Sequence, residues 1–353
     1  IIVATGGELV AGAVDGVFDG VAIDSRNIAP GELFMAIVGD VHDGHTFVNK
    51  ALEKGVRGVL VEKDKAGDLI AAAHARKERT IIAVNDTTRA LGDLAAFNRN
   101  RFPLKVIALT GSNGKTSTRT MLTLVAEQRY DTLATMGNFN NQIGLPLTLL
   151  RLEETHTLAV LELGMNQPGE IKRLAEICRP DVGMITNVAP AHLEGLGSIE
   201  GVLRAKGELL EELNTNAKAI LNADDTRVAG LAENAPAEVL LFGLSDKADV
   251  RATHIQEQGH GLSFSLVVPG ETIEVYLATP GWFMVSNALA AAAAGYLMDI
   301  PLNEIKIGLE RFQPVSGRMQ IRKLKNGIHI IDDAYNANPH SVKAALDTLQ
   351  QVA

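Results

Sequence analysis

The sequence predicts an α/β protein with a small N-terminal α/β domain, a central domain on a parallel sheet, and the start of a third domain. From Lys105 onward, apolar runs typical of strands alternate with helical patterns. A glycine-rich loop stands between the first of these strands and the helix that follows it. The chain has 353 residues, 46% of them hydrophobic, which is enough for two or three domains with cores of their own.

The N-terminal section joins short apolar runs by polar turns. Strands are expected at 20–23, 32–37 and 58–61, and a helix at 47–54. The basic stretch 98–103 ends in a proline before a new apolar run begins. We therefore expect a small α/β domain followed by a linker.

The central section repeats a strand-and-helix pattern. Strands are expected at 106–109, 157–161 and 183–186, with a helix at 115–128 after the first of them. Such a pattern implies a parallel sheet covered on both faces, which binds its ligands at the carboxyl ends of the strands. A third section begins with a strand at 328–331 and a helix from Ser341, too little for a domain, so we expect that domain to be incomplete. The expected domains are 1–99, 100–312 and 313–353.

Composition narrows the possible partners. A net charge of -9 gives no general basic field for nucleic acid or anionic lipid. The Ala-rich run 288–294 is too short to span a membrane, and the N-terminus lacks a basic signal-peptide start. The single cysteine, Cys178, excludes an intramolecular disulfide. We expect a cytoplasmic monomer that neither binds nucleic acid nor enters a membrane.

The loop 111–116, Gly-Ser-Asn-Gly-Lys-Thr, is the strongest chemical signal. Between a strand and a helix, its backbone N–H groups can hold phosphate oxygens while Lys115 neutralises their charge and Thr116 reaches Mg²⁺. Leu109 stands where a full Walker motif has its first glycine, so the loop is a shortened variant. The alternative is a glycine turn with a solvated lysine.

Two polar side chains follow other strands of the same sheet. Glu162 comes directly after one expected strand and His192 follows another, so both should reach the edge that carries the phosphate loop. Each residue alone would be structural, Glu162 as a cap or surface charge and His192 as a satisfied polar residue. Their parallel placement makes a Mg²⁺ site an equal alternative. Lys206, by contrast, lies in a helical pattern with Glu neighbours, which by itself predicts an exposed lysine.

These motifs, in their order along the chain, resemble the signature of the Mur ligases of peptidoglycan synthesis and their relative folylpolyglutamate synthase. Two further segments, 137–146 and 332–339, resemble the members that join D-alanyl-D-alanine to UDP-N-acetylmuramoyl-tripeptide. The resemblance covers nearly the whole chain and rests on 110–116, Glu162, 186–192, 205–208, 221–225, Asn287 and 317–318.

The resemblance implies a three-domain Mur ligase architecture with a UDP-sugar-binding N-terminal domain, a central P-loop ATPase domain and a Rossmann-like third domain. It implies an ATP-dependent ligase that uses Mg²⁺, with UDP-N-acetylmuramoyl-tripeptide and D-alanyl-D-alanine as substrates. The tripeptide carboxylate would attack the ATP γ-phosphorus, and the amine of D-alanyl-D-alanine would then attack the resulting acyl phosphate.

The resemblance also assigns roles to single residues. Lys115 would bind the β- and γ-phosphates, and Thr116, Glu162 and His192 would serve Mg²⁺. Lys206 would react with CO₂ and, as a carbamate, hold a second Mg²⁺ or position substrate. The implied catalytic residues are Lys115, Glu162, His192 and Lys206. The implied nucleotide contacts are Gly111, Ser112, Asn113, Gly114, Lys115, Thr116, Ser117, Asn287, Arg318 and Asp333.

Substrate contacts and one departure complete the prediction. Ser25 and Arg26 resemble contacts to the uridine nucleotide, although Asp-Ser-Arg is also a common turn. Asn140 and Asn141 would orient the tripeptide or stabilise a loop. Where the family has His-Asn-x-x-Asn, this chain has two apolar residues, Phe283 and Met284, before Asn287, and stacking by Trp282 or Phe283 could replace the lost hydrogen bonds.

Three hypotheses therefore stand. The chain adds D-alanyl-D-alanine, or it adds another amino acid or glutamate as a related ligase, or it binds nucleotide without ligating. The amine that the chain uses distinguishes the two ligase hypotheses from each other. A UDP-sugar site in the first domain distinguishes both from the non-ligating nucleotide binder.

Overall fold

The computed structural model describes residues 1–13, 15–67, 79–259, 261–325 and 328–352. The chain forms two compact units, the first made of Ile1–Phe102 with Gln142–Leu152 and the second of Pro103–Asn141 with Glu153–Ala353. The segment 142–152, which the sequence pattern placed in the central domain, thus packs with the first unit. The three-domain division stays a prediction.

The first unit is built on a five-stranded sheet in the order β1-β5-β4-β3-β2. Strands β2 to β5 are parallel, and β1 pairs antiparallel with β5. The strands are β1 (Glu8–Ala11), β2 (Val21–Ala22), β3 (Leu33–Met35), β4 (Gly58–Glu62) and β5 (Thr80–Val84). The helices described over their whole length are α1 (Ile2–Thr5), the 3₁₀ turn η1 (Gly44–Phe47), α2 (Val48–Glu53), α4 (Thr87–Arg99) and α6 (Gly144–Leu149).

The central strands of this sheet are apolar over their whole length. In β5 every residue is buried, and in β4 only Glu62 reaches solvent. Continuous apolar strands need cover on both faces, and two separate core clusters provide it, one around Phe34 and the other around Leu33. Helix α4 begins at Asp86, whose carboxylate accepts a hydrogen bond from Arg89 N.

The second unit contains a nine-stranded sheet in the order β14-β13-β12-β11-β10-β9-β6-β8-β7. From β7 to β12 the neighbours are parallel. The first strands are β6 (Lys105–Thr110), β7 (Thr132–Ala134), β8 (Leu158–Glu162), β9 (Val182–Ile185) and β10 (Lys218–Asn222). The others are β11 (Glu238–Gly243), β12 (Val250–Gln258), β13 (Gly261–Val268) and β14 (Glu271–Leu277).

The antiparallel end of this sheet was not predicted. Strand β13 pairs antiparallel with β12 and with β14. Only Pro269 and Gly270 separate β13 from β14, and Gly270 has φ +86°. A two-residue turn can join only antiparallel strands, so the sheet is mixed.

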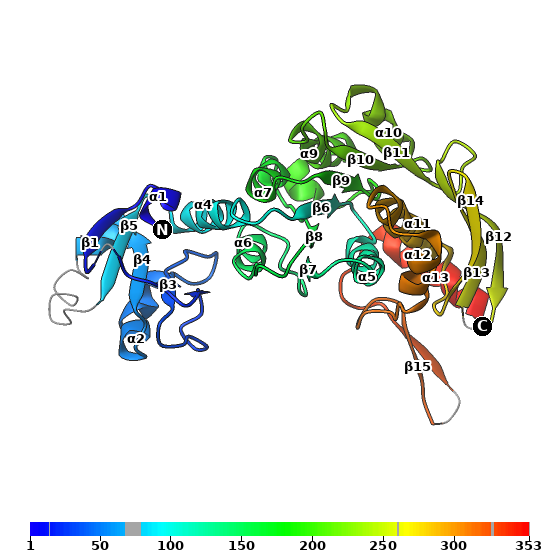
Figure 1. Ribbon diagram of the computed structural model, residues 1–353. Coiled ribbons are helices and arrows are strands. Elements are labelled where there is room, and N and C mark those ends of the chain that lie inside the picture. Colours follow the sequence, from blue (N-terminus) through cyan, green and yellow to red (C-terminus); the bar gives the residue numbers. More distant parts are fainter. Residues whose placement is uncertain (14, 68–78, 260, 326–327, 353) are drawn as a thin grey trace. The chain divides into compact units, whose positions relative to one another are not determined.

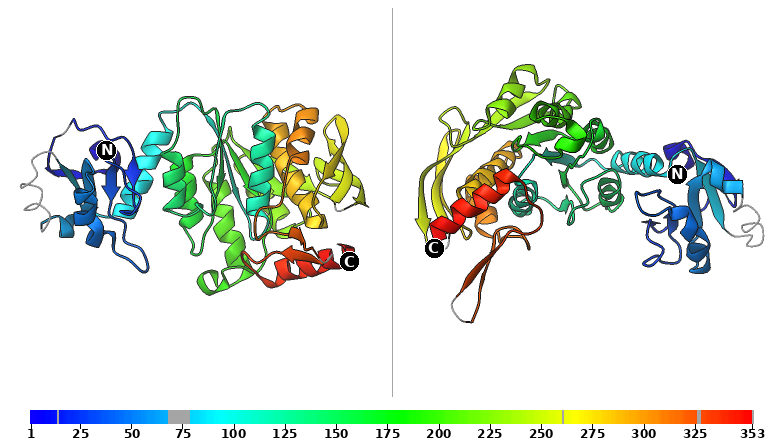
Figure 2. Two further views of the ribbon diagram at one scale, coloured as in Figure 1. Left: turned by 90° about the horizontal axis from the view of Figure 1, so that it is seen from below. Right: turned by 180° about the vertical axis from the view of Figure 1, so that it is seen from behind.

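Helices cover both faces of the parallel part. Helices α5 (Lys115–Ala126) and α11 (Trp282–Leu297) lie on one face, and α7 (Glu170–Cys178) and α9 (Ile199–Glu211) on the other, as the views in Figures 1 and 2 show. The Ala-rich run expected to be too short for a membrane forms the buried centre of α11. In the described part of the chain, no helix has the length and hydropathy needed to cross a bilayer. The remaining helices are α8 (Leu193–Leu196), α10 (Thr226–Gly230), η2 (Leu231–Asn234) and α12 (Leu302–Glu310).

The third section packs within the second unit as a hairpin followed by a helix. Strand β15 (Gln320–Lys323) pairs antiparallel with β16 (His329–Asp332), and α13 (Pro339–Val352) follows. The expected strand at 328–331 and helix from Ser341 correspond to β16 and α13. Strand β15 had no counterpart in the sequence prediction.

Candidate active site

The glycine-rich loop joins β6 to α5, as the sequence predicts. Gly114 caps the helix with φ +78°, a conformation that strongly favours glycine. A Cβ at this position would also lie 2.3 Å from Asn287 Oδ1 of α11. Glycine therefore lets the loop turn sharply and lets α11 approach its backbone.

The segment after β9 holds the other side of the loop. Asn113 N donates to Asn187 Oδ1 at 2.8 Å, and Asn187 Nδ2 donates to Asn113 O at 2.9 Å. Thr186 Oγ1 donates to the same Asn113 carbonyl at 3.0 Å. The 221–225 motif supports this segment, because Asn222 Nδ2 donates to Thr186 O and Asp225 Oδ2 accepts from Val188 N. The Thr-Asn pair after β9 thus fixes the shape of the loop.

Lys115 is half-buried at the first position of α5. Its Nζ donates to Gly111 O at 2.8 Å, so the side chain folds back over the loop. Burial lowers the pKa of Lys115, whereas the charge of Glu162 raises it and that of Arg318 lowers it. A bound polyanion would favour the ammonium form and take the donor now used by the loop carbonyl.

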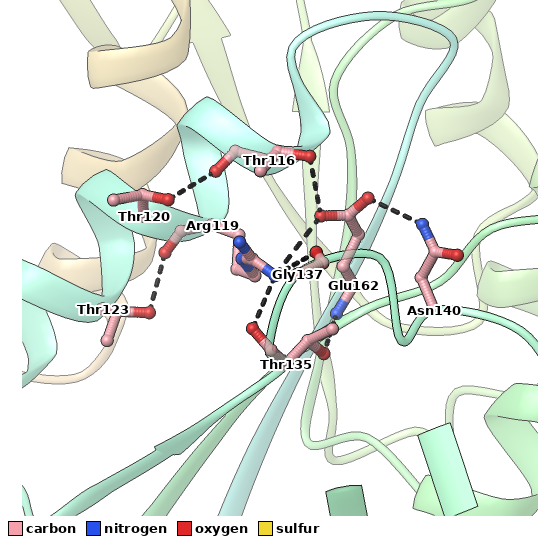
Figure 3. Close-up of polar contacts among 8 residues, drawn as sticks. All are labelled: Thr116, Arg119, Thr120, Thr123, Thr135, Gly137, Asn140 and Glu162. Carbon is pink, nitrogen blue, oxygen red and sulfur yellow. Dashed lines mark hydrogen bonds and ion pairs between the residues drawn. The ribbon is translucent and has the colours of Figure 1, made fainter. Parts of the chain in front are cut away.

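Glu162 is the last residue of β8, beside β6, and it is buried. Thr116 Oγ1 donates to Glu162 Oε2 at 3.2 Å, while Asn140 Nδ2 donates to Glu162 Oε1 at 2.9 Å (Figure 3). The structure therefore brings Thr116 and Glu162 together at the carboxyl ends of two neighbouring strands. It also places Asn140 on the carboxylate, while Asn141 is exposed.

This pair of oxygen groups suits a hard divalent cation. A hydroxyl and a carboxylate in contact are ligands that Mg²⁺ prefers, and Mg²⁺ commonly takes one or two protein ligands while phosphates and water supply the rest. Within the described ranges, no three His, Cys, Asp or Glu side chains gather closely enough to hold a metal by themselves. The site therefore fits a metal that arrives with a polyphosphate.

His192 lies outside the hydrogen bonds of this pair. It precedes α8 in a left-handed conformation, with φ +52°. Partial burial lowers the pKa of His192, and the positive charges of Lys115 and Lys206 lower it further. The imidazole is therefore neutral at pH 7, the form that can coordinate a metal or accept a hydrogen bond.

Lys206 corrects the simple helical interpretation. The residue is 3% exposed, although its helical pattern alone predicted a solvated lysine. Burial, and then the charge of Lys115, lowers the pKa of Lys206 well below its ordinary value. No acidic side chain of the described residues forms an ion pair with it. The motif's Glu208 instead accepts hydrogen bonds from Gly169 N and Lys172 N at the start of α7.

The departure at 283–284 has a local compensation. Asn287 Nδ2 donates to Met284 Sδ at 3.6 Å, and Asn287 Oδ1 accepts from Thr118 Oγ1 at 3.3 Å. The Met284 thioether thus supplies an acceptor for the Asn287 amide. Phe283 is half-buried against the core and Trp282 is 44% exposed, so Trp282 remains available for stacking.

Residues of the third section approach the loop. The Arg318 guanidinium lies 4.3 Å from the centre of the Tyr335 ring, and Asp333 Oδ1 accepts from Met319 N. Burial raises the pKa of Asp333. Asn338 Nδ2 donates to Asn113 Oδ1 at 2.7 Å. The Asn113 Nδ2 donor is buried with no partner among the described residues, so the loop carries a donor that lacks an acceptor.

In the first unit, the Asp-Ser-Arg motif forms a self-contained turn. Arg26 donates through N, Nε and Nη2 to the Asp24 carboxylate, and these hydrogen bonds lower the pKa of Asp24 to about 2. The Arg26 side chain is 79% exposed, while Ser25 is buried. A local turn thus accounts for these hydrogen bonds, and the Arg26 guanidinium still faces solvent.

Two functional candidates were missed by sequence reasoning. Arg119 lies one turn after Lys115, is buried, and forms an ion pair with Glu162 at 3.9 Å. The sequence offered one signal for Arg119: it is an arginine on a helix face that is otherwise buried. Asn338 contacts a residue 225 positions away, a contact that no local pattern could show.

Comparison with known proteins agrees with this geometry. The family profile described as "Mur ligase middle domain" matches residues 109–295, "Mur ligase family, catalytic domain" matches 17–99, and "Mur ligase, glutamate ligase domain" matches 317–353. The chain is 39% identical over 337 residues to the UDP-N-acetylmuramoyl-tripeptide--D-alanyl-D-alanine ligase of Escherichia coli, covering 95% of this chain and 72% of that protein.

Solved structures show the same similarity. A crystal structure of MurF from Acinetobacter baumannii superposes with a TM-score of 0.91 at 35% identity, covering 99% of this chain and 75% of that one. MurF ligase from Thermotoga maritima in complex with ADP gives 0.84 at 26% identity, covering 96% and 76%. With similarity over this much of both chains, in sequence and in structure, the chain belongs to the Mur ligase family.

Proposed function

We propose that the chain catalyses ATP-dependent ligation of D-alanyl-D-alanine to UDP-N-acetylmuramoyl-tripeptide, a step of peptidoglycan precursor synthesis. One observation carries the proposal: the Thr116 hydroxyl and Asn140 amide hold opposite oxygens of Glu162. Thr116 belongs to the phosphate loop, and Asn140 belongs to the segment resembling ligases with these substrates. A single carboxylate therefore joins the nucleotide side to the peptide side.

The reaction forms one amide bond in two displacements. A terminal carboxylate oxygen of the tripeptide attacks the ATP γ-phosphorus, the bond to the bridging oxygen breaks, and ADP leaves. The D-alanyl-D-alanine amine then attacks the acyl carbon, the amine loses a proton, and inorganic phosphate leaves. Both partners of the first step are anions, so Lys115 and the loop amides must neutralise charge before they can approach.

Thr116 and Glu162 would hold Mg²⁺, with the neutral His192 as a further ligand. When bound, the cation would neutralise the β- and γ-phosphates. The unpartnered Asn113 Nδ2 would find its acceptor in a phosphate oxygen. Asn287, Arg318 and Asp333 would contact the nucleoside, with Tyr335 beneath the Arg318 guanidinium. In the first unit, Arg26 would exchange Asp24 for the diphosphate of the UDP-sugar.

Lys206 has the chemistry required for carbamylation. Only the neutral amine attacks CO₂, and the lowered pKa of Lys206 favours that form. Nζ forms a bond to the CO₂ carbon, one C–O π bond opens onto oxygen and one N–H proton leaves, which converts the neutral amine into a carbamate anion. A carbamate at this position would face the positive charges of Lys115 and the metal.

The amine specificity tests the proposal. Phosphate release is measured with UDP-N-acetylmuramoyl-tripeptide, ATP and Mg²⁺, first without an amine and then with D-alanyl-D-alanine, a diamino acid or glutamate in parallel. We expect release that depends on D-alanyl-D-alanine. Release only with a diamino acid or glutamate would show another ligase of the family.

A second measurement addresses the non-ligating alternative. A nucleotide switch has no reason to bind a UDP-sugar in its first domain. Binding of UDP-N-acetylmuramoyl-tripeptide by the wild type, weakened by Arg26→Ala, would contradict that alternative. Binding of ATP alone, with no affinity for the UDP-sugar, would favour it.

A further inference from the structure

Arg119 lies at the centre of the contacts around Glu162, yet none of the functions proposed above uses it. It occupies α5 one turn after Lys115, and its side chain is 9% exposed. An arginine remains protonated inside proteins, so burial leaves a cation that must find partners. The residues in contact with it therefore show what this charge does.

A single nitrogen of Arg119 makes three contacts. Nη1 donates to Thr135 O at 2.5 Å and to Gly137 O at 3.1 Å, and it lies 3.9 Å from Glu162 Oε2 (Figure 3). Both carbonyls belong to the segment 135–140, which follows β7 and leads to Asn140. The guanidinium thus contacts the metal carboxylate and the backbone that carries the peptide-side asparagine.

The segment 135–140 also forms two hydrogen bonds with Glu162. Glu162 N donates to Thr135 Oγ1 at 3.0 Å, and Asn140 Nδ2 donates to Glu162 Oε1. Figure 3 shows the carboxylate with Asn140 on one side and Arg119 on the other. Because the pair is buried, its attraction is screened little by water or salt. Arg119, Asn140 and Thr116 thus contact the carboxylate, while Thr135 holds the backbone of the same residue.

We propose that Arg119 is a positioning residue that keeps the Glu162 carboxylate and the segment 135–140 in a fixed relation for metal binding. The inference rests on the proposed function, because it takes Glu162 as a Mg²⁺ ligand. Arg119 does not touch the reacting atoms. Without it, Glu162 would keep its charge but lose its orientation, and the segment would lose the donor for two carbonyls.

The test uses ADP binding measured by calorimetry, with and without Mg²⁺, so that it does not depend on turnover. The magnesium gain is the dissociation constant without Mg²⁺ divided by the dissociation constant with Mg²⁺. We expect Arg119→Met to reduce this gain about tenfold, because Glu162 loses its ion pair and the segment 135–140 loses the charged donor to its carbonyls. The dissociation constant without Mg²⁺ should change less than about threefold, because no phosphate contact is lost.

Arg119→Lys separates positioning from packing. Lysine restores a cation with N–H donors and should recover most of the gain, whereas methionine fills the space without charge. If the role were packing alone, methionine would serve as well as lysine. Hydrogen exchange provides a second readout: the amides of 135–141 should exchange faster in Arg119→Met than in Arg119→Lys.

Two controls complete the design. Arg129→Met removes an exposed arginine that pairs with Glu304 beyond the end of α5, and it should leave the gain unchanged. In a Glu162→Gln background, Arg119→Met should have no additional effect on the gain.

The outcomes distinguish the two proposals. A wild type without any magnesium gain would contradict the metal role of Glu162, and therefore the proposed function. A wild-type gain that Arg119→Met leaves intact would contradict the inference alone. Loss of the folded state in both Arg119 variants, judged by thermal unfolding, would also contradict it, because a positioning role leaves the fold in place.

Discussion

The turn at Asp24–Arg26 and the phosphate loop are both polar motifs at strand ends, but they are built differently. In the turn, the Arg26 side chain binds a carboxylate two residues away and is mostly exposed. In the loop, Thr116 finds its partner 46 residues away and Asn113 finds one 74 residues away, largely out of solvent. The first motif is locally satisfied, and the second is held by the whole unit.

This difference determines what each motif can do. An exposed ion pair contributes little to stability and exchanges readily, so Arg26 can leave Asp24 for a ligand anion. A buried network keeps its geometry before the substrate arrives, which catalysis of charged reactants requires. Changes in the loop should therefore affect chemistry, and those that break its buried hydrogen bonds should also affect folding, whereas changes in the turn should affect binding alone.

Lys115→Met should have the largest effect. It removes the cation that neutralises the attacked phosphate, so ligation measured by ADP release should fall about 10³-fold. The melting temperature should change little, because methionine replaces the apolar stem of the lysine. Ligation within about tenfold of the wild type would contradict the role of Lys115 in the loop.

Lys206→Met should separate activity from stability. Ligation should fall about 100-fold, while the free energy of unfolding at neutral pH in CO₂-depleted buffer should rise by about 1 kcal/mol, since a buried amine without an ion pair is removed. Folding lowers the pKa of Lys206. At pH values between the lowered pKa and the ordinary 10.5, the unfolded state therefore binds more protons than the folded state. Stability of the wild type should therefore rise with pH in that window.

Lys206→Met also tests the predicted pH dependence of stability. Lys206→Met has no group that titrates at this position, so the added rise in stability should disappear from its denaturant unfolding curves. A wild type and a variant with the same pH dependence would show that Lys206 is solvated.

Gly111→Ala should affect stability in the loop. A Cβ at this position would lie 1.9 Å from Thr186 Oγ1, so Thr186 must move and give up its hydrogen bond to Asn113. We expect a loss of about 2 kcal/mol in chemical denaturation. Gly230→Ala in α10 is the matched control, because nothing lies within 4 Å of its Cβ and its φ is helical. Equal effects of the two substitutions would contradict the close fit of the loop.

Arg26→Ala should have the smallest effect. The affinity for UDP-N-acetylmuramoyl-tripeptide should fall about tenfold through loss of a charged hydrogen bond, with no measurable change in melting temperature. Because Arg26 holds the pKa of Asp24 at about 2, the carboxylate stays charged at higher pH, and its contribution is lost only as the pH falls from 3.8 toward that value. The affinity difference should therefore be the same at about pH 6 and about pH 8. A difference that appears in melting temperature alone would favour a purely structural turn.

The fold was largely predictable where local patterns determine it. Strands β6, β8 and β9 and helix α5 follow the apolar periodicity, and Gly114 marks the turn that precedes the helix. The antiparallel end of the sheet was missed because β12 and β14 have half-exposed patterns and no helix separates β12, β13 and β14. The packing of 142–152 with the first unit depends on tertiary contacts that no local signal reports.

The candidate site divides in the same way. Lys115, Thr116 and Glu162 could be proposed from the sequence, because each stands at or just after the end of a strand of a parallel sheet. The burial of Lys206 was not, since an isolated helix pattern does not show which face a neighbouring helix covers. The contacts of Arg119 and Asn338 are to partners far away in the sequence, so only the folded chain shows them.

An isotope experiment tests the central claim most directly. The tripeptide carboxylate is labelled with ¹⁸O and incubated with ATP, Mg²⁺ and D-alanyl-D-alanine, and the released phosphate is analysed by mass spectrometry. If the carboxylate attacks the γ-phosphorus, each phosphate released during ligation carries one oxygen from the carboxylate, and the new amide keeps the other. Unlabelled phosphate released in step with amide formation would contradict the acyl-phosphate mechanism.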